Sequence, residues 1–558
     1  MATNLLLRKV LVVAGLSLFI IFPELGSRWF RWSGMLIGWV ARKRVLAITV
    51  VALVSLGLTA GLGLLVRMPQ PYAHDEFSYL LAGDTFAHGR LANPTHPMWE
   101  HFETFHVIQQ PTYASKYPPA QGLALALGQK LTGYPIAGVW ITTALACAAV
   151  CWMMYAWLPP RWALAGGLLT ALHPVVIEWS QSYWGGSVAL GGGALVLGAL
   201  GRILRESHTS YGLALAFGMA VLANSRPYEG MVLCSVVGAV LLWQLLTQPP
   251  PASPLVRMLA SFLVVFLLTA VTTAYYNVRV TGSPWRLPYQ VHEAAYGITP
   301  LFIWQRPRPE PPYRHEVLRD FHVRLEPGSY RAQESLKSWL ASVWGKYSEL
   351  TAVHLPTTFR YLILTILALT VPTALSKDPP LVLLLIVLGG FVVGTLPEVF
   401  MGHRYTAPAA GLFFLFILRS LRHVSRWRWH GTPLGRSLIR VCLISCVAGF
   451  ILTTFRGLTP TSEGLDLQRW GANRRALVES LTHQDARHLI IVRYGRRHSP
   501  DQEWVYNGAD IDHSQVVWAR EMDPMRNQAL LTYFRDRHAW LLSVDDDTAA
   551  PQLIPYTH

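Results

Sequence analysis

The chain has 558 residues, of which 52% are hydrophobic and only 14% are charged. Soluble proteins usually carry about 25% charged residues, so this composition excludes an ordinary soluble protein. The formal net charge is +15, but the excess lies in short segments beside apolar runs, such as 42–44 and 419–440. That distribution is typical of cytoplasmic loops facing anionic lipid headgroups, and it argues against a nucleic acid partner.

The apolar residues form runs close to the 20 or so residues that a helix needs to cross a bilayer. The first run, Val10–Phe22, is short and is followed by a basic and aromatic stretch, so we expect residues 1–44 to form an interfacial or marginally spanning segment. The first secure crossing is 45–66. Together the runs predict a polytopic all-α membrane domain over 45–455 with about 11–12 transmembrane helices, the further crossings lying near 134–158, 162–180, 184–204, 209–224, 228–246, 255–276, 359–375, 380–396, 404–420 and 437–455.

Two long polar segments interrupt this pattern, 67–133 (the first polar segment) and 277–357 (the second polar segment). Lys and Arg are concentrated in 24–44, 202–206, 247–257 and 419–440, which the positive-inside rule assigns to the cytoplasm. With alternating crossings, both polar segments and the C-terminal region then face outward. We therefore expect them on the outer side of the membrane.

The C-terminal region, 456–558, has the character of a small extracytoplasmic α/β domain. Two stretches have helical spacing and three read as strands, and their alternation favours a small mixed or parallel sheet. The helical stretches are Asn473–Leu481 and Asn527–Phe534, and the strands are His488–Arg493, Gln515–Ala519 and Ala539–Val544.

A helix is predicted from His74 to Gly89, directly after the first secure crossing. Asp75 and Glu76 stand at its start, just outside the hydrocarbon. Asp is a good N-cap residue, so Asp75 has a structural interpretation. A general base is the functional interpretation, and the two are compatible.

Three further motifs follow in chain order. Lys116-Tyr117-Pro118-Pro119 opens an apolar helix, Arg226-Pro227 interrupts the 209–246 apolar stretch, and Arg404-Tyr405-Thr406-Ala407-Pro408 opens a late crossing. With the acidic pair at 75–76, their order resembles the GT-C superfamily of glycosyltransferases over about 45–455. More specifically, the chain resembles the branch that contains protein O-mannosyltransferases (family 39) and lipid A aminoarabinose transferases.

The resemblance implies a polyprenyl-phosphate-linked sugar as donor. It also implies that Asp75, with Glu76, is the catalytic acidic residue that orients or deprotonates an acceptor hydroxyl. Arg404 and Tyr405, with Arg226 and Lys116, are the expected phosphate-binding residues. Glycosyl transfer needs a base for the hydroxyl and positive charge for the departing phosphate, for which an arginine fork is well suited. The alternative for each arginine is a snorkelling residue at the interface.

The acceptor side departs from the family pattern. Where relatives often carry Asp, the segment after Glu178 reads glycine, so Glu178 is the candidate replacement, or else it marks the membrane edge. Tyr117, His74 and His106 are candidates for contacts with sugar or acceptor. His74, His96, His101 and His106, with Glu100 and Glu103, also suggest a divalent metal site. Their spacing is not that of metal ligands, so ordinary loop histidines or sugar-binding histidines are favoured over a metal site.

A multispanning transporter and an O-antigen-ligase-like protein are the alternatives. A transporter should gather its polar groups at the bilayer midplane, whereas the predicted charged residues here map to one outer edge. We expect a glycosyltransferase in a bacterial inner membrane, with its site and C-terminus facing the periplasm. The sequence identifies neither the sugar nor the acceptor.

Overall fold

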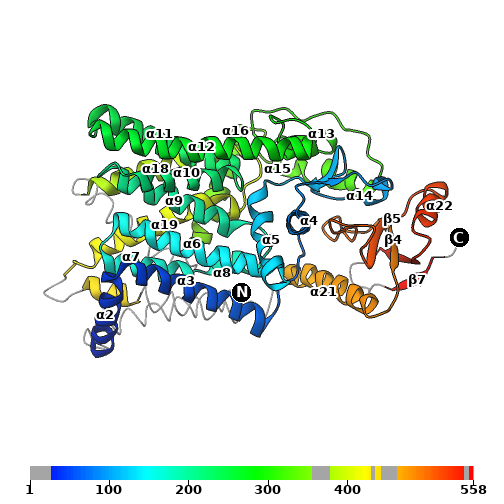
Figure 1. Cartoon of the computed structure of the whole chain (residues 1–558), viewed down its shortest axis with the longest axis horizontal. Coiled ribbons are helices and arrows are strands. Elements are labelled where there is room, and N and C mark those ends of the chain that lie inside the picture. The colour runs from blue at the N-terminus through cyan, green and yellow to red at the C-terminus, as the bar shows by residue number, and fades with distance from the viewer. Residues whose placement is uncertain (1–26, 355–377, 429–433, 442–461, 546–551, 557–558) are drawn as a thin grey trace.

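The computed structural model describes residues 27–354, 378–428, 434–441, 462–545 and 552–556 (Figure 1). Most of these residues are helical. The helices form a bundle whose members run side by side in Figure 1, and a mixed β-sheet of the C-terminal region lies beyond one end of it.

Within the described ranges, six helices are long and apolar enough to cross a membrane, or seven if α7 (Pro160–Ala171) and α8 (Pro174–Ser180), which meet at a 52° bend, form one span. The chain is therefore a multi-pass membrane protein. The six are α3 with η1 (Arg44–Val66), α6 (Pro135–Trp157), α9 (Gly186–Ile203), α11 (Pro227–Thr247), α12 (Ala252–Thr281) and η4 (His403–Thr406) with α19 (Ala407–Val424).

Two shorter apolar helices, α10 (Thr209–Ala223) and α18 (Pro379–Thr395), coincide with two other predicted crossings. The expected crossing at 359–375 and the apolar run Val10–Phe22 lie outside the described residues, as does most of 437–455. The helix α2 (Ser27–Arg42) precedes α3.

Proline marks many of the helix starts. Helices α6, α7, α8, α11 and α18 all begin with proline in the first turn, where the missing N–H removes no intrahelical bond and the fixed φ suits the helix. Gly133 and Gly282, both with φ near +80°, end α5 and α12 in the left-handed conformation that glycine adopts without strain.

The two polar segments fold together at one end of the bundle, which we call the loop end (Figure 1). The first contains a small antiparallel sheet in the order β1-β3-β2. Its elements are α4 (His74–Ala87), β1 (Asn93–Pro94), η2 (Trp99–Phe102), β2 (Val107–Ile108), β3 (Thr112–Ser115) and α5 (Pro119–Thr132). The second contributes α13 (Pro288–Ala295), α14 (Glu316–Arg319), η3 (Asp320–Leu325), α15 (Pro327–Arg331) and α16 (Leu336–His354).

The C-terminal region confirms the predicted small mixed sheet, with strand order β5-β4-β6-β7. Strand β4 is parallel to β5 and β6, and β7 is antiparallel to β6. The elements are α21 (Ser462–Thr482), β4 (His488–Tyr494), β5 (Val516–Arg520), α22 (Pro524–Tyr533), β6 (His538–Val544) and β7 (Leu553–Pro555). Buried Leu489 and Val517 share a core with Leu81 of α4 and Phe102 of η2, so the sheet packs on the first polar segment.

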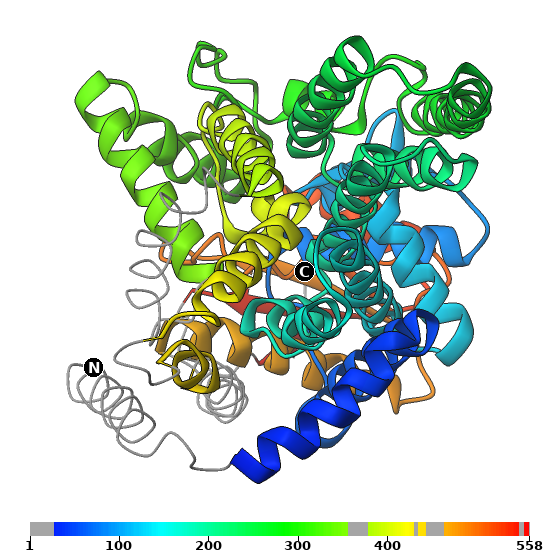
Figure 2. The same cartoon turned by 90° about the vertical axis from the view of Figure 1, so that its left-hand side faces the viewer.

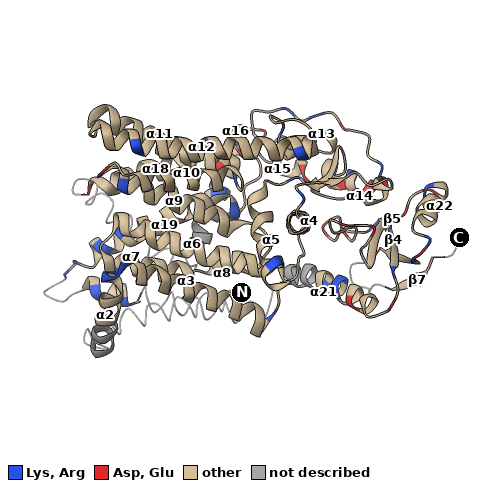
Figure 3. Cartoon of the chain, viewed as in Figure 1, with Lys and Arg blue, Asp and Glu red and all other residues tan. Residues whose placement is uncertain are grey.

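Basic residues gather at the opposite end of the bundle, which we call the basic end (Figure 3). Arg42 ends α2, Arg44 starts α3, Arg161 lies in the first turn of α7 and Arg202 in the last turn of α9. Figure 2 is viewed from this end. Many of the helices are seen roughly along their axes, with the C-terminal region behind them.

Close packing of α9 against α19 connects this scaffold to the loop end. A Cβ added at Gly193 of α9 would lie 1.8 Å from the carbonyl oxygen of Pro408, whereas one added at Gly191 would make only ordinary contacts, the nearest at 3.5 Å. Since α19 follows directly after Arg404, Gly193 permits the approach that brings Arg404 toward the start of α9.

Gly193→Ala is therefore expected to destabilise the protein by about 1–3 kcal/mol, because backbone must shift to admit the methyl group. Thermal unfolding in detergent measures the effect, and Gly191→Ala on the same helix is the control. Equal unfolding temperatures for the two variants would contradict the close α9–α19 contact.

Candidate functional site

The site lies at the start of α4, between the ends of the spans and the C-terminal sheet (Figure 1). The structure corrects one interpretation of the sequence, because Ala73 and not Asp75 is the N-cap of this helix. The carboxylate of Glu76 does the capping instead, accepting hydrogen bonds from the backbone N–H of Tyr72 (3.0 Å) and Ala73 (3.2 Å).

The other oxygen of Glu76 accepts hydrogen bonds from the Ser182 hydroxyl (2.8 Å) and the Tyr183 N–H (2.9 Å). Glu76 is buried, and these four donors match the four acceptor positions of a carboxylate. The side chain thus fastens α4 to the turn before α9. This geometry suits a structural group better than a proton acceptor for a substrate.

Asp75 has a different environment. Its Oδ1 accepts a hydrogen bond from the Tyr117 hydroxyl, and its Oδ2 lies 3.9 Å from Nε2 of His106. Burial raises the pKa of Asp75, although the Tyr117 hydrogen bond and the charges of Lys116 and Arg226 oppose the rise. The side chain keeps 19% of its surface exposed, so a substrate can reach this carboxylate.

Aromatic rings from two elements pack against Tyr117, the hydrogen-bond partner of Asp75. Tyr79 stacks on Tyr117 at 4.4 Å, and Tyr289 of α13 meets Tyr117 edge-on at 5.4 Å. All three rings are largely buried or half-buried. They fix the direction of the Tyr117 hydroxyl toward Asp75.

Lys116, expected to bind phosphate, is buried, and its Nζ lies 3.6 Å from Oε1 of Glu293. Burial alone raises the pKa of Glu293, but His292, whose Nδ1 lies 3.5 Å from Oε1 of Glu293, and the charge of Lys116 outweigh it, and the pKa falls to about 2. The carboxylate is therefore ionised at neutral pH, and it balances the charge of Lys116.

Arg404 of η4 is buried, with its guanidinium 4.5 Å above the Trp184 ring. Its contacts are long: Nη2 lies 3.4 Å from the Ser182 hydroxyl and 3.5 Å from Oε1 of Glu178, and only the contact of Nη1 with His403 is as short as 3.0 Å. Among the described residues, Arg404 Nε has no hydrogen-bond partner. The structure therefore brings Glu178 and Arg404 together and leaves one buried donor unused.

Arg226, at the start of α11, lies 4.5 Å from the ring of Tyr405 and 3.7 Å from Oε1 of Glu229. It is buried, and its Nη2 likewise has no hydrogen-bond partner in the part of the chain that the structure describes. Its positive charge lowers the pKa of Asp75 and so opposes the effect of burial. The structure thus brings together Arg226 and Tyr405, which the sequence analysis had placed in two separate motifs.

The two candidate histidines of the site are both buried. His74 lies against Phe105 and Phe321, with its Nδ1 2.8 Å from the hydroxyl of Tyr506 in the C-terminal region. His106 faces Asp75. Burial lowers the pKa of His74 to about 3 and that of His106 well below its usual value, so both rings are neutral at neutral pH.

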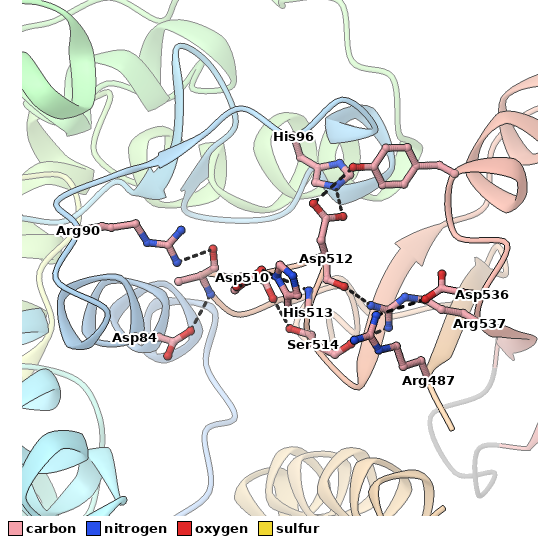
Figure 4. Close-up of polar contacts among 12 residues, drawn as sticks. Asp84, Arg90, His96, Arg487, Asp510, Asp512, His513, Ser514, Asp536 and Arg537 are labelled. Carbon is pink, nitrogen blue, oxygen red and sulfur yellow. Dashed lines mark hydrogen bonds and ion pairs between the residues drawn. The ribbon is translucent and has the colours of Figure 1, made fainter. Parts of the chain in front are cut away.

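The other histidines of the first polar segment point elsewhere. Nε2 of His96 lies 3.1 Å from Asp512, and Nδ1 of His101 lies 2.8 Å from the carbonyl oxygen of Arg520. Figure 4 shows His96 among the polar contacts that join this segment to the C-terminal region. No group of three or more His, Cys, Asp or Glu that could hold a metal ion occurs within the described ranges.

Several residues of the site were not predicted from the sequence. Tyr289, His292 and Glu293 come from the second polar segment, and Tyr506 comes from the C-terminal region. Each reaches the site through a contact distant in sequence. Pro288, which lies in the first turn of α13, is a local signal that could have indicated a helix at this point.

No family model and no curated protein matches this sequence. Among solved structures, the chain is similar to ArnT from Cupriavidus metallidurans bound to undecaprenyl phosphate, with a TM-score of 0.48 and 13% identity over 91% of this chain and 93% of that one. It is also similar to the Archaeoglobus fulgidus oligosaccharyltransferase in its apo form, with a TM-score of 0.47 and 11% identity over 81% of this chain. The match spans 62% of that longer protein. These likenesses, at 13% and 11% sequence identity, concern the fold alone.

The two acidic residues at the start of α4 are expected to respond oppositely to neutralisation. A raised pKa means that folding favours protonated Asp75, so its charge lowers stability at pH 7. Asp75→Asn should leave the unfolding temperature unchanged or raise it. Glu76→Gln should destabilise by at least about 2 kcal/mol, since it turns an acceptor of charge-assisted hydrogen bonds into a donor facing other donors. An equal loss in both variants, measured by thermal unfolding, would make Asp75 a structural residue too.

Proposed function

We propose that this chain is a membrane glycosyltransferase that moves a sugar from a polyprenyl-phosphate donor to an acceptor hydroxyl. One arrangement carries the proposal. The Asp75 side chain is 19% exposed, and the positive charge of Arg226 lowers its pKa against the effect of burial. Arg226 and Arg404 each have a buried N–H without a partner among the described residues.

The unused N–H groups suit a phosphate. Buried polar groups are nearly always hydrogen-bonded, so an arginine with a spare donor favours a ligand that brings acceptors. Phosphate oxygens accept strong charge-assisted hydrogen bonds from guanidinium groups, and the phosphate gains negative charge as the sugar leaves. Arg404 and Arg226 are the proposed phosphate ligands, with Tyr405 beside Arg226. Lys116 is a less favoured ligand, because Glu293 balances its charge.

Asp75 is the proposed base. It takes the proton of the acceptor hydroxyl as that oxygen bonds to the anomeric carbon, the bond from this carbon to the phosphate oxygen breaks, and polyprenyl phosphate leaves with its electron pair. Attack from the face opposite the phosphate inverts the anomeric configuration. Tyr117 donates a hydrogen bond to Asp75, and His106 lies beside it. Glu178, whose side chain is 56% exposed, is the proposed contact to the acceptor. The contact of His74 with Tyr506 favours a role in positioning α4.

The proposed location is a bacterial inner membrane with the loop end facing the periplasm. The arginines at the basic end support this orientation, because Lys and Arg are retained on the cytoplasmic side (Figure 3). The donor would then enter from the outer leaflet, beside Arg404 and Arg226.

The test is turnover of a panel of radiolabelled polyprenyl-phosphate sugars by the full chain in nanodiscs. Wild type should release or transfer sugar, and Asp75→Asn should lose about 100-fold or more of this activity while still binding the donor. Equal activity in both proteins would remove Asp75 from its role. Failure of every lipid-linked donor to bind or react would favour a transporter instead.

The Tyr117 hydroxyl is expected to affect the pH at which activity falls on the acid side of the pH–rate profile, through the pKa of Asp75. Its hydrogen bond stabilises the Asp75 carboxylate and lowers the pKa, so Tyr117→Phe should raise the pKa further. Because the base acts only when deprotonated, the pH of half-maximal activity on the acid side should move upward. Tyr79→Phe, which changes the stacked neighbour but no hydrogen bond to Asp75, is the control. An unmoved acid limb in Tyr117→Phe would show that another group titrates there.

A further inference from the structure

A cavity of about 160 Å³ lies at the loop end, lined by residues of the segment from η2 to β2, of helix α13 and of the chain from Pro312 to α14. It is separate from the surroundings of Arg404 and Arg226. Its lining includes Trp99, Glu103, Gln109, His292, Tyr313 and Arg314.

The floor of this cavity is polar and deeply buried. Glu103 and Gln109 are each 2% exposed, and His292 is 1% exposed. Within the described ranges, Oε2 of Glu103, Oε1 of Gln109 and Nε2 of His292 have no hydrogen-bond partner. Three side chains that line the cavity thus each carry a buried polar atom without a protein partner, which is costly unless a ligand or water satisfies it.

These atoms are held in place by their neighbours. Oε1 of Glu103 accepts a hydrogen bond from the Tyr296 hydroxyl (2.8 Å) and lies 3.4 Å from Nη1 of Arg314, while Nε2 of His315 stands 3.5 Å from Oε2. The amide nitrogen of Gln109 donates to the carbonyl oxygen of Phe102 at 2.6 Å, which leaves its oxygen as the free end. The acceptors are therefore preorganised.

The free atoms specify the ligand. Two are acceptors and the third is an imidazole nitrogen that donates or accepts, so the ligand must present several hydroxyl groups close together. The Glu103 carboxylate disfavours an anion. Trp99 and Tyr313 add aromatic surface, to which the C–H face of a sugar ring can pack. A single sugar ring combines these properties.

The cavity shares a wall with the site. The ring of His292 lies 5.9 Å from that of His106, whose Nε2 is 3.9 Å from Asp75. At the other side, exposed Gln110, Pro312 and Arg314 form the rim. We infer that this cavity binds one sugar unit of a glycan acceptor, flanking the unit whose hydroxyl Asp75 activates. The inference names the acceptor class of the proposed glycosyltransferase and rests on that function.

The test uses neighbouring alanines of α13. Ala295 lines the cavity and Ala294 does not, and both are exposed. The full chain in nanodiscs is titrated with a panel of methyl glycosides of hexoses and pentoses, followed by saturation-transfer NMR. At least one glycoside should bind to wild type, about tenfold or more weakly to Ala295→Trp, and within twofold of wild type to Ala294→Trp. Gln109→Met, which keeps side-chain length and removes the free carbonyl oxygen, should weaken binding as well.

Two outcomes overturn the inference: no glycoside binds to wild type, or binding survives both Ala295→Trp and Gln109→Met in protein with the wild-type unfolding temperature. Hydrolysis of the lipid-linked donor, measured in the same samples, separates this result from the proposed function. Donor hydrolysis without glycoside binding rejects the cavity alone. Glycoside binding without any donor turnover rejects the glycosyltransferase and, with it, the acceptor role of the cavity.

Discussion

The carboxylate of Glu76 joins two parts of the chain that are about a hundred residues apart, and the geometry of the loop end depends on it. A buried charge is tolerated only when hydrogen bonds replace its hydration, and here four donors do so. One of them, the Ser182 hydroxyl, also lies 3.4 Å from Nη2 of Arg404. Glu76 thereby connects the start of α4, which carries Asp75, to the helix that carries the arginine, and it sets the relation between proposed base and proposed phosphate ligand.

The remaining charges at the loop end divide into paired and incompletely paired groups. Lys116 is balanced by Glu293, and Arg520 is balanced by Glu503 in the C-terminal region at 2.6 Å. Arg226 and Arg404 differ in the length of their contacts with acidic residues, 3.7 Å to Glu229 and 3.5 Å to Glu178, although Arg520 also has a buried N–H without a partner among the described residues. A buried unsatisfied donor costs about 1–3 kcal/mol, a cost that a functional site accepts when its ligand supplies the acceptor. The long acid contacts of Arg226 and Arg404 support the proposal that these two arginines bind the phosphate.

Local patterns in the sequence were enough to predict much of this architecture. The apolar runs predicted spans, Pro119 at the start of α5 followed from its motif, and alternating helices and strands predicted the C-terminal sheet, although the short strand β7 was missed. Asp75, Arg226 and Arg404 could be assigned to one edge because each stands at the end of an apolar run. The partners of these residues could not be predicted, since the contacts of Lys116 with Glu293, and of His74 with Tyr506, join segments distant in sequence with no periodic signal. For the same reason the sequence grouped His96 and His101 with His74 and His106, while the structure separates them.

The central claim is that the loop end binds the phosphate of a polyprenyl lipid beside Asp75. A cryo-electron microscopy structure of the full chain in nanodiscs with undecaprenyl phosphate tests it most directly. The account predicts phosphate density within hydrogen-bond distance of Nε of Arg404 and Nη2 of Arg226, with the Asp75 carboxylate facing it across the space that the sugar would occupy. Phosphate bound away from both arginines, or at the basic end of the bundle, would contradict it.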